Sequence, residues 1–370
     1  AVLLGPGINM KRSPLCGRNF EYFSEDPFLA GRLGAAYVSA AQGEDVAVSL
    51  KHFAANNQET NRQTSNSQID ERALREIYLS AFEYVVKTAR PATVMASYNR
   101  LNGYYACENR HLLTEILREE WGFDGMVISD WGACADLAKA VKAGMDLEMP
   151  DSHGIHARKL KAALKAGEIS EEDIAKAAGR IEKLVKKYAP DNRAKKDTSD
   201  AHEIAKQLAW ESAVLLKNDG VLPLDTAKKI AFVGPYTNNH EIKSSWSFTG
   251  DSKDCVTIQE AAEKVFDASR TTYAEGCPVI GNDVELIGFT ETTPKKYSEE
   301  ELAAMEQSAL QAAKEADLVV MPMGEHYLQS GEATSRAMID VPEIQMELFR
   351  KVLAVNPNVV VVLFNGRPLD

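Results

Sequence analysis

Short apolar runs alternate with helix-length amphipathic segments through the first half of the chain. We interpret these runs as strands: Val2–Leu4, Val46–Leu50, Thr93–Ser97, Met126–Ser129 and, with a weaker pattern, Met145–Glu148. Amphipathic segments lie between them, and one, Glu71–Thr88, has apolar residues at helical spacing. Strands that alternate with helices need crossover connections, and these build a parallel sheet. The pattern predicts an α/β fold that forms part of a (β/α)8 barrel, which takes about 250 residues when complete.

A polar, helix-breaking segment divides the chain into two halves. Residues 153–188 have a helical pattern, and Ser170 with Asp173 is typical of a capping box that opens the second helix there. The next residues read APDNRAKKDTSD and include Pro190. We therefore predict a first domain over residues 1–188, a linker over residues 189–200 and a second domain over residues 201–370.

The second half repeats the alternation of helices and strands. We predict helices over residues 201–216 and 298–315, and strands at Ile230–Val233, Leu318–Met321 and Val359–Phe364. This pattern indicates a layered α/β domain. Apolar runs also stand close to both ends of the sequence, whereas the ends of native chains are usually polar. We therefore expect the sequence to be an internal segment of a longer protein.

Composition narrows the classes of partner. The chain has 370 residues, of which 54 are acidic and 42 are basic, so its formal net charge is -12. Nucleic acids and anionic membranes both favour basic surfaces, and we expect neither as a partner. No apolar run approaches the roughly 18 residues that a membrane span needs. The excess of acidic over basic residues fits a small or neutral substrate, and it leaves the oligomeric state open.

The number and spacing of the cysteines argue against a disulfide framework and against a zinc site. They are Cys16, Cys107, Cys134, Cys255 and Cys277. An odd number of cysteines without a CxxC pair makes a poor disulfide framework and a poor zinc site. We expect reduced, mostly structural thiols and no metal ion. This cysteine usage favours a cytoplasmic location.

Polar and aromatic side chains follow the predicted strands of the first half. They are Arg18 in the loop after the first strand, Lys51 and His52 after the second, Tyr98 after the third, and Asp130 and Trp131 after the fourth. The carboxyl ends of parallel strands meet at one rim of the sheet. This mixture suits a sugar, because an aromatic ring packs on a pyranose face while charged groups bind its hydroxyls.

Each of these residues also has an ordinary structural interpretation. An aspartate at a strand end often caps the next helix, a tryptophan there often packs at the rim, and Lys51 and His52 could form plain polar contacts. Their coincidence at four strand ends favours a site. The sequence has no HExxH, GxGxxG, P-loop or GxSxG motif that would point to another chemistry.

Longer stretches of the sequence resemble one enzyme family. GPGINMKRSPLCGRNFEYFSEDP, SLKHFAANNQE, MASYNRLNG, ISDWGA and AGMDLEMP occur in the order in which they occur in the N-terminal barrel of glycoside hydrolase family 3. AWESAVLLKNDGVLPL, FVGP, SSWSFTGD, MGEHYLQSGEATSRAMIDVP and LFNGRPL resemble its αβα sandwich domain, most closely in the bacterial β-glucosidase branch. The resemblance implies a partial (β/α)8 barrel followed by a partial αβα sandwich.

The resemblance also implies a retaining hydrolase that needs no cofactor. Asp130 stands where the family has its nucleophile, and Glu332, in SGEATSR, matches the acid/base of the β-glucosidase branch. Glu325 is the nearest rival for the second role. A retaining enzyme places its two carboxyl groups roughly 5 to 5.5 Å apart. We expect Lys51 to help to keep Asp130 ionised, and partial burial and a nearby carboxylate to keep Glu332 protonated.

The sugar-binding positions carry over in the same way. Arg18, Lys51, His52 and Tyr98 resemble residues of the innermost subsite, Trp131 resembles one wall of it, and Trp246 in SSWSF matches an outer wall. The segment after Lys51-His52 differs from that of the family's N-acetylglucosaminidase branch, so that activity is not expected. The resemblance implies that the first barrel elements of the family, with a carboxylate that binds the sugar, would precede the first residue of this sequence.

The resemblance implies an exo-acting β-glucosidase that cleaves β-linked oligosaccharides or aryl β-glycosides. A β-xylosidase or α-L-arabinofuranosidase of the same family is the nearest alternative. An inactive fragment or a non-catalytic sugar-binding protein is a further one, although the presence of both Asp130 and Glu332 argues against it. A dehydrogenase of the Rossmann type would fit the alternation, but the glycine fingerprint is missing.

Overall fold

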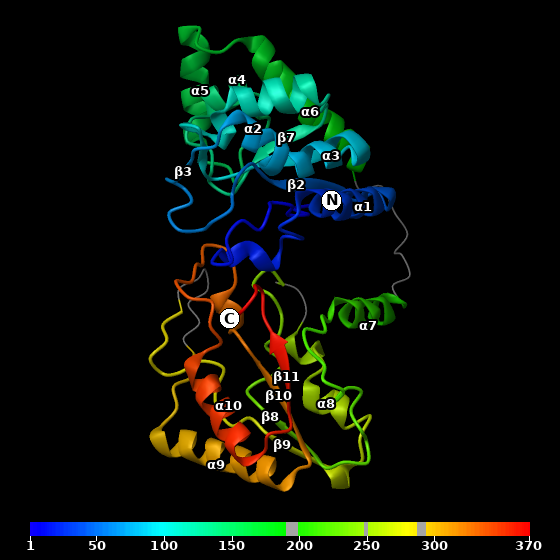
Figure 1. The fold of residues 1–370 in the computed structure, drawn as a ribbon. Coiled ribbons are helices and arrows are strands. Elements are labelled where there is room, and N and C mark those ends of the chain that lie inside the picture. Colours follow the sequence, from blue (N-terminus) through cyan, green and yellow to red (C-terminus); the bar gives the residue numbers. More distant parts are fainter. Residues whose placement is uncertain (190–198, 248–250, 287–293) are drawn as a thin grey trace.

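The computed structural model describes residues 1–189, 199–247, 251–286 and 294–370. Two parallel sheets, each covered by helices, lie one above the other in Figure 1, and the first half of the chain forms the upper one. The predicted α/β class is therefore confirmed. Most of the predicted linker, residues 190–198, falls outside the described residues.

The first sheet has the strand order β1-β2-β4-β7, with all neighbouring strands parallel. Its strands are β1 (Val2–Leu3), β2 (Ala47–Phe53), β4 (Thr93–Ala96) and β7 (Met126–Ser129). The last three are largely apolar and almost wholly buried, as expected of parallel strands covered on both faces. Lys51 and His52, which were predicted to follow the second strand, lie within the last residues of β2. The predicted strand Met145–Glu148 contributes only one bridge, between Leu147 and Ile128.

Helices connect these strands and cover the sheet. They are α1 (Pro27–Gly43), α2 (Glu71–Ala73), α3 (Ser80–Ala89), α4 (Leu137–Ala143), α5 (Ile155–Ala166) and α6 (Glu171–Tyr188), with π-helical η2 (Leu74–Tyr78) and η4 (His111–Glu120) and 3-10 turns η1 (Gly17–Phe20) and η3 (Ala106–Glu108). Asp26 caps α1 and Pro27 occupies its first turn. The predicted capping box of Ser170 and Asp173 opens α6. The predicted helix Glu71–Thr88 is broken by η2 into α2 and α3.

A buried aromatic cluster joins the first sheet to its helices. Phe53 of β2 lies 5.2 Å from Phe82 of α3 and 5.8 Å from Trp121, between ring centroids, and both contacts are edge-on. A small sheet of β3 (Asn66–Ser67), β5 (Arg100–Leu101) and β6 (Tyr104–Tyr105) lies in the loops beyond this core.

The second sheet has the order β11-β10-β8-β9 and is also parallel throughout. Its elements are β8 (Ile230–Val233), β9 (Thr271–Ala274), β10 (Leu318–Gly324) and β11 (Val359–Phe364), with α7 (Ala201–Ser212), α8 (Ile258–Ala262), α9 (Glu299–Glu315), α10 (Glu343–Val355), η5 (Ser252–Asp254), η6 (Ala268–Arg270) and η7 (Tyr327–Gln329). The predicted helix over residues 201–216 ends at Ser212, and its apolar residues are exposed.

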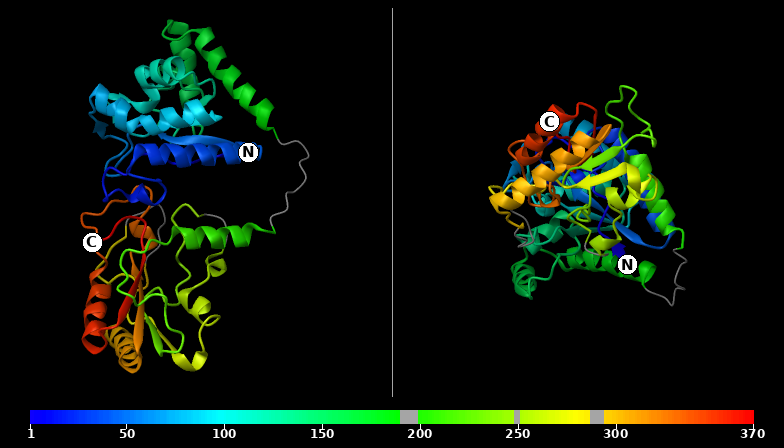
Figure 2. Two further views of the ribbon diagram at one scale, coloured as in Figure 1. Left: turned by 45° about the vertical axis from the view of Figure 1, so that its right-hand side comes forward. Right: turned by 90° about the horizontal axis from the view of Figure 1, so that it is seen from below.

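Side chains of the second sheet alternate between two helix layers. Ala231, Val233, Val319 and Met321 pack with α9 and α10, whereas Ile230, Phe232 and Val320 pack with α8. Successive residues of a strand point to opposite faces, so one apolar run supplies both interfaces. The second half is the three-layer α/β/α arrangement that its sequence predicts (Figure 2).

The loops of the two halves meet backbone to backbone. Gly17 donates its N–H to the carbonyl oxygen of Thr334 at 3.0 Å, and Cys16 forms an isolated bridge with Ser335. A Cβ atom at Gly17 would lie 2.2 Å from the carbonyl oxygens of Gly331 and Thr334, so only glycine fits there. The contact fixes loop 330–335 of the second half against the first half (Figure 1).

Candidate active site

Asp130 lies where β7 ends, and its side chain is buried with 7% of the residue surface exposed. Its backbone N–H donates to the carbonyl oxygen of Ala96 at 3.0 Å, which continues the sheet register. The carboxylate Oδ1 accepts the N–H of Trp131 at 2.7 Å. Burial raises the pKa of Asp130, and the charges of Arg18 and Arg62 and the Trp131 hydrogen bond oppose that rise.

His52 faces Asp130 from β2. Its Nε2 atom lies 3.7 Å from Asp130 Oδ2, and its Nδ1 atom lies 3.1 Å from the hydroxyl of Tyr22. Burial, followed by the charges of Arg18 and Lys51, lowers the pKa of His52 well below its ordinary value. The imidazole is therefore neutral at pH 7 and acts as a polar neighbour of Asp130 rather than as its counter-ion.

Asn9 fixes the backbone of His52. The Oδ1 atom of Asn9 accepts the His52 N–H at 2.7 Å, and its Nδ2 atom donates to the His52 carbonyl oxygen at 2.9 Å. Asn9 comes from the loop after β1, so the ends of two neighbouring strands are tied together. Both residues are buried, and this pairing holds the side chain of His52 toward Asp130.

Glu21 holds the two predicted cationic residues together. It forms ion pairs with Arg18 and with Lys51, whose Nζ atom lies 3.1 Å from its carboxylate. The same two cations lie 5.9 Å and 5.8 Å from the ring centroid of Trp246. The second half of the chain therefore places Trp246 beside Arg18 and Lys51. The charges of Arg18 and Arg62 lower the pKa of Asp130, and the expected effect of Lys51 on Asp130 stays a prediction.

Tyr98 and Trp131 flank the carboxylate. The Tyr98 hydroxyl donates to the carbonyl oxygen of Trp131 at 3.0 Å, and burial with the charges of Asp130 and Glu332 raises the Tyr98 pKa. The Trp131 residue is 52% exposed, so its ring is not part of the core. An exposed aromatic ring beside a buried carboxylate is a suitable surface for the apolar face of a sugar.

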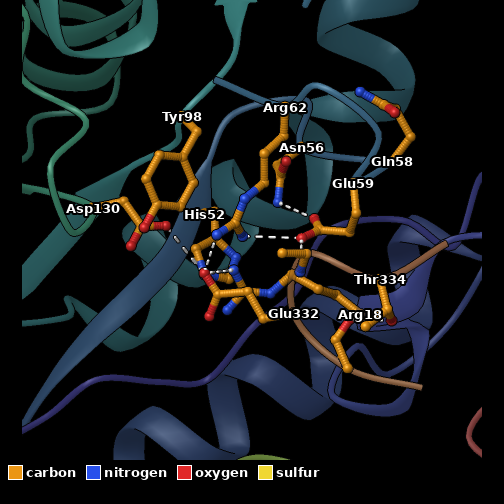
Figure 3. A network of polar contacts seen from close by, with 12 residues as sticks. Arg18, His52, Asn56, Gln58, Glu59, Arg62, Tyr98, Asp130, Glu332 and Thr334 are labelled. Atoms are coloured by element: carbon orange, nitrogen blue, oxygen red, sulfur yellow. Dashed lines mark hydrogen bonds and ion pairs between the residues drawn. The ribbon is translucent and has the colours of Figure 1, made fainter. Parts of the chain in front are cut away.

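Glu332 comes from the loop after η7 and is as buried as Asp130. Its Oε1 atom pairs with Arg62 and lies 3.3 Å from Arg18 Nη1. Glu325, the rival, is instead enclosed within the second half, where it pairs with Arg336 and Arg367 and accepts the N–H of Gly366 at 2.9 Å. The structure thus joins Glu332, and not Glu325, to the residues around Asp130 (Figure 3).

Arg62 and Glu59 belong to this network and were not predicted. The guanidinium of Arg62 lies 4.1 Å above the ring centroid of Tyr98 and contacts both Glu59 and Glu332. Both residues lie in the long polar loop after β2, several residues beyond the strand end. A search restricted to strand ends overlooks them, but the length of this loop is itself typical of a functional segment.

The arrangement brings two buried carboxylates from different halves of the chain into one polar network (Figure 3). Arginine, lysine, tyrosine and neutral histidine side chains surround them. A pair of carboxylates can supply both a nucleophile and a proton donor, and the surrounding donors can bind hydroxyl groups.

The described helices include none that is both long and apolar enough to cross a bilayer.

Family models match both halves of the chain. The glycosyl hydrolase family 3 N-terminal domain matches residues 2–184, and the C-terminal domain of that family matches residues 213–370. Among curated relatives, thermostable beta-glucosidase B of Acetivibrio thermocellus is 43% identical over 376 residues, covering 100% of this chain and 47% of that protein. An exo-alpha-(1->6)-L-arabinopyranosidase of Bifidobacterium longum is 41% identical, covering 99% of this chain and 47% of that protein.

Solved structures of beta-glucosidases also superimpose on the whole chain. The family 3 beta-glucosidase of Bifidobacterium adolescentis superimposes with a TM-score of 0.86 at 39% identity, covering 100% of this chain and 52% of that one. Beta-glucosidase 3B of Thermotoga neapolitana, in complex with alpha-D-glucose, superimposes with a TM-score of 0.83 at 32% identity, covering 100% of this chain and 54% of that one. The chain therefore spans about half the length of the relatives it matches, and it belongs to glycosyl hydrolase family 3.

Proposed function

We propose that the intact protein is a retaining, exo-acting β-glucosidase that removes terminal β-D-glucosyl residues from β-linked oligosaccharides or aryl β-glycosides. The observation that carries the proposal is the single polar network that contains both Asp130 and Glu332. Relatives named beta-glucosidase support the choice of substrate. We further propose residues 1–188 and 201–370 as the two domains, joined by the linker over residues 189–200.

In the first step, the Asp130 carboxylate attacks the anomeric carbon of the bound sugar. The bond from that carbon to the leaving oxygen breaks, and the leaving oxygen takes a proton from the carboxyl group of Glu332. The product is a covalent ester between Asp130 and the sugar. The buried position of Asp130 favours this attack, because a partly desolvated carboxylate is a stronger nucleophile.

In the second step, the Glu332 carboxylate takes a proton from water while the water oxygen bonds to the anomeric carbon. The ester bond to Asp130 breaks, and two inversions give net retention. The guanidinium groups of Arg62 and Arg18 contact Glu332 and complement its ionised form, which this step requires. The first step requires the protonated form, so Glu332 changes its charge once in each half of the cycle.

The neighbouring side chains would hold the sugar in place. Arg18, Lys51 and His52 present donors close to Asp130, and Tyr98 lies between Arg62 and Trp131. Trp131 and Trp246 would form two walls, one from each half of the chain. A ring bound between aromatic walls, with its hydroxyls bound by charged groups, is oriented for attack at one carbon.

Pentose substrates are the second candidate. A relative that is 41% identical is named an arabinopyranosidase, so a family member of this similarity acts on a five-carbon sugar. A β-xylosidase or α-L-arabinofuranosidase activity would use the same two carboxylates. The choice depends on the contacts at the outer carbon of the sugar ring, which add only about 1–3 kcal/mol of discrimination per methylene-sized group.

A panel of p-nitrophenyl glycosides tests these alternatives in the intact protein. The panel contains the β-D-glucoside, the β-D-xyloside, the α-L-arabinofuranoside and the α-L-arabinopyranoside. The β-glucosidase proposal expects the highest kcat/KM for the β-D-glucoside, and loss of all four activities on Asp130→Ala. Near-wild-type turnover by Asp130→Ala would remove Asp130 from the nucleophile role, and a higher kcat/KM for a pentoside would select the second candidate.

A further inference from the structure

Glu59 links the two halves of the chain at the candidate proton donor. It lies in the loop after β2, and only 4% of its surface is exposed. Its Oε2 atom accepts the backbone N–H of Ala333 at 2.8 Å, and Ala333 directly follows Glu332. The same oxygen accepts Arg62 Nη1 at 2.9 Å. Glu59 therefore holds both the backbone beside Glu332 and the arginine that contacts the Glu332 side chain.

Arg62 bridges two carboxylates with different nitrogens. Nη1 contacts Glu59 and Nη2 contacts Glu332, so the position of the planar guanidinium depends on both partners. Burial raises the pKa of Glu59, and the charges of Arg18 and Arg62 and the hydrogen bond from Ala333 oppose this rise. A buried carboxylate kept in place by an arginine and a backbone N–H has few alternative positions.

The backbone beside Glu332 also needs support. Ala333 has a φ of 59°, a left-handed conformation that costs an alanine free energy unless the surroundings impose it. The hydrogen bond from the Ala333 N–H to Glu59 is one such constraint, and it comes from the other half of the chain. Loss of this acceptor would let the loop relax and carry Glu332 away from Asp130.

We propose that Glu59 is a positioning residue that sets the location of Glu332 for proton transfer. The inference rests on the proposed function, in which Glu332 is the acid/base. Glu59 does not touch the reacting atoms and acts through Arg62 and through the Ala333 backbone. Its loss should impair the steps that need proton transfer by Glu332 and spare the attack by Asp130.

Aryl β-glucosides with different leaving groups separate these two steps. A dinitrophenolate leaves without protonation, whereas an unsubstituted or alkyl-substituted phenolate needs a proton from Glu332. In the intact protein we expect Glu59→Gln to lower kcat/KM for the poor leaving group by about 10-fold or more, within the range of general acid catalysis. The value for the activated substrate should stay near that of the wild type. Glu59→Asp, which keeps the charge, should restore part of the loss.

Two further variants make the outcomes distinguishable. Thr60→Val removes a neighbouring contact between the halves, from Thr60 Oγ1 to Ser335 Oγ at 3.1 Å. This variant should leave kcat/KM unchanged for both substrates. Glu332→Gln should show the leaving-group dependence in full. If Glu332→Gln lacks it, the acid/base assignment fails. If Glu332→Gln shows the leaving-group dependence, but Glu59→Gln lowers kcat/KM equally for both substrates or for neither, only the positioning role of Glu59 is overturned.

A second, independent cluster suits a metal ion. Cys134, Glu148 and His156 each offer one ligand atom, and these three atoms lie within 4.8 Å of one another. Cys134 is in the loop after Asp130, Glu148 follows the Leu147 bridge, and His156 is in the first turn of α5. A thiol, an imidazole and a carboxylate are each ligand types that zinc binds in proteins.

The surroundings of this cluster hold its ligands in place. Glu148 contacts the Nδ1 atom of His156, and Ser152 Oγ lies 3.4 Å from the other Glu148 oxygen. Ser152 Oγ also accepts the backbone N–H of His156 at 3.1 Å. A tetrahedral zinc ion needs ligand atoms roughly 3.3–3.8 Å apart. Separations near the 4.8 Å limit would therefore shorten by about 1–1.5 Å, while Glu148 and His156, which are in direct contact, would move apart.

We infer that Cys134, Glu148 and His156 bind one Zn²⁺ ion, contrary to the expectation from cysteine spacing alone. On binding, the Cys134 thiol gives its proton to solvent, the contact between Glu148 and His156 Nδ1 opens as the imidazole proton shifts to Nε2, and the ion exchanges bound waters for the three ligands. The site would tie the loop after Asp130 to α5. The same ligands would accept Co²⁺, whose bond to a thiolate gives a charge-transfer absorption band.

The test is a titration of chelator-treated protein with Zn²⁺ and with Co²⁺. We expect one Zn²⁺ per chain by elemental analysis after dialysis, and a thiolate-to-cobalt band. Cys134→Ser and His156→Ala should abolish both, whereas Cys277→Ser, which alters a buried thiol in the second sheet's core, should abolish neither. Absence of stoichiometric binding, or unchanged binding by Cys134→Ser, would overturn the inference.

Discussion

At the scale of single residues, the burial of Asp130 makes its negative charge costly to the fold. Its pKa is raised by burial, so its ionised form is less favourable in the folded state than in the unfolded state. The carboxyl group therefore stabilises the fold most at low pH. That contribution is lost as the pH rises through the raised pKa of the folded state.

Asp130→Asn is expected to abolish turnover and to raise the free energy of unfolding at pH 7. Loss of a covalent nucleophile should lower kcat on the order of 10⁴-fold or more, and the neutral amide removes the cost of a buried charge. Thermal unfolding at pH 7 and near pH 3.5 checks the stability. The difference between variant and wild type should shrink at the lower pH. A variant that is less stable at pH 7 would contradict this account of Asp130.

The pH profile of the intact enzyme should report the same raised pKa. In the proposed mechanism Asp130 attacks only when it is ionised, so kcat/KM should fall as the pH decreases through its pKa. Because burial raises that pKa, the acidic limb should lie above about 3.9, the ordinary value for aspartate. Initial rates with an activated aryl β-glucoside measure the limb. A plateau that extends below about pH 3.9 would contradict the prediction.

The sequence indicates the strand-end residues of the site but not their partners. Asp130 follows β7, and Lys51 and His52 lie in the last residues of β2, and parallel topology brings such positions to one rim. Glu59 and Arg62 lie in a loop whose path depends on contacts with the other half of the chain. No local pattern encodes those contacts, so their place in the network emerges only from the structure.

At the scale of elements, the predicted strands are confirmed more closely than the predicted helices. Buried parallel strands are continuous apolar runs, which are easy to recognise. The segment Glu71–Thr88 keeps its helical spacing, but η2 interrupts it with a wider turn. The helix over residues 201–216 ends at Ser212, where apolar spacing alone gives no stop signal. Met145–Glu148 forms only one bridge, because apolar character does not ensure a paired neighbour.

Gly17→Ala is expected to disturb the contact between loop 330–335 and the first half. The new Cβ would lie 2.2 Å from two backbone oxygens, so the loop must move. A displacement of about 1 Å near a catalytic group can lower activity about 100-fold, and we expect a fall in kcat/KM of about 10- to 100-fold. Initial rates and thermal unfolding of the intact protein measure the effect.

Gly43→Ala is the matched control for that substitution. Gly43 ends α1, and apart from its own helix and chain neighbours no atom lies within 4 Å of an added Cβ. This change should leave kcat/KM unaltered and should not lower stability, because alanine favours helix more than glycine does. Equal losses in both variants would argue that the Gly17 contact does not position the loop.

At the scale of the whole molecule, the site depends on both halves of the chain. The first contributes Asp130 and most of the sugar-binding candidates, and the second contributes Glu332 and Trp246. The sequence predicts two α/β halves because each has its own alternation of strands and helices. It does not predict how they meet, because that contact is made by loops, through backbone atoms such as those of Gly17 and Thr334.

The exposed apolar surface of the first half predicts self-association of the 370-residue chain studied alone. Phe28, Leu29, Leu33 and Tyr37 of α1 are exposed, and β1 is an edge strand with exposed side chains. Such surfaces favour association in water. Sedimentation velocity over a range of concentrations should show oligomers, and Leu29→Lys with Leu33→Lys should reduce them. A monomer at every concentration would contradict the prediction.

The most direct test of the proposed function is covalent trapping of the intact protein with an activated 2-deoxy-2-fluoro-β-glucoside. The fluorine slows hydrolysis of the glycosyl-enzyme, so the ester accumulates and its mass is measured. We predict one added fluoroglucosyl group per chain, located by peptide mapping to the peptide that contains Asp130. Labelling of a different carboxylate, or turnover without any covalent adduct from either this reagent or its xylosyl counterpart, would contradict the assignment of Asp130 as the nucleophile.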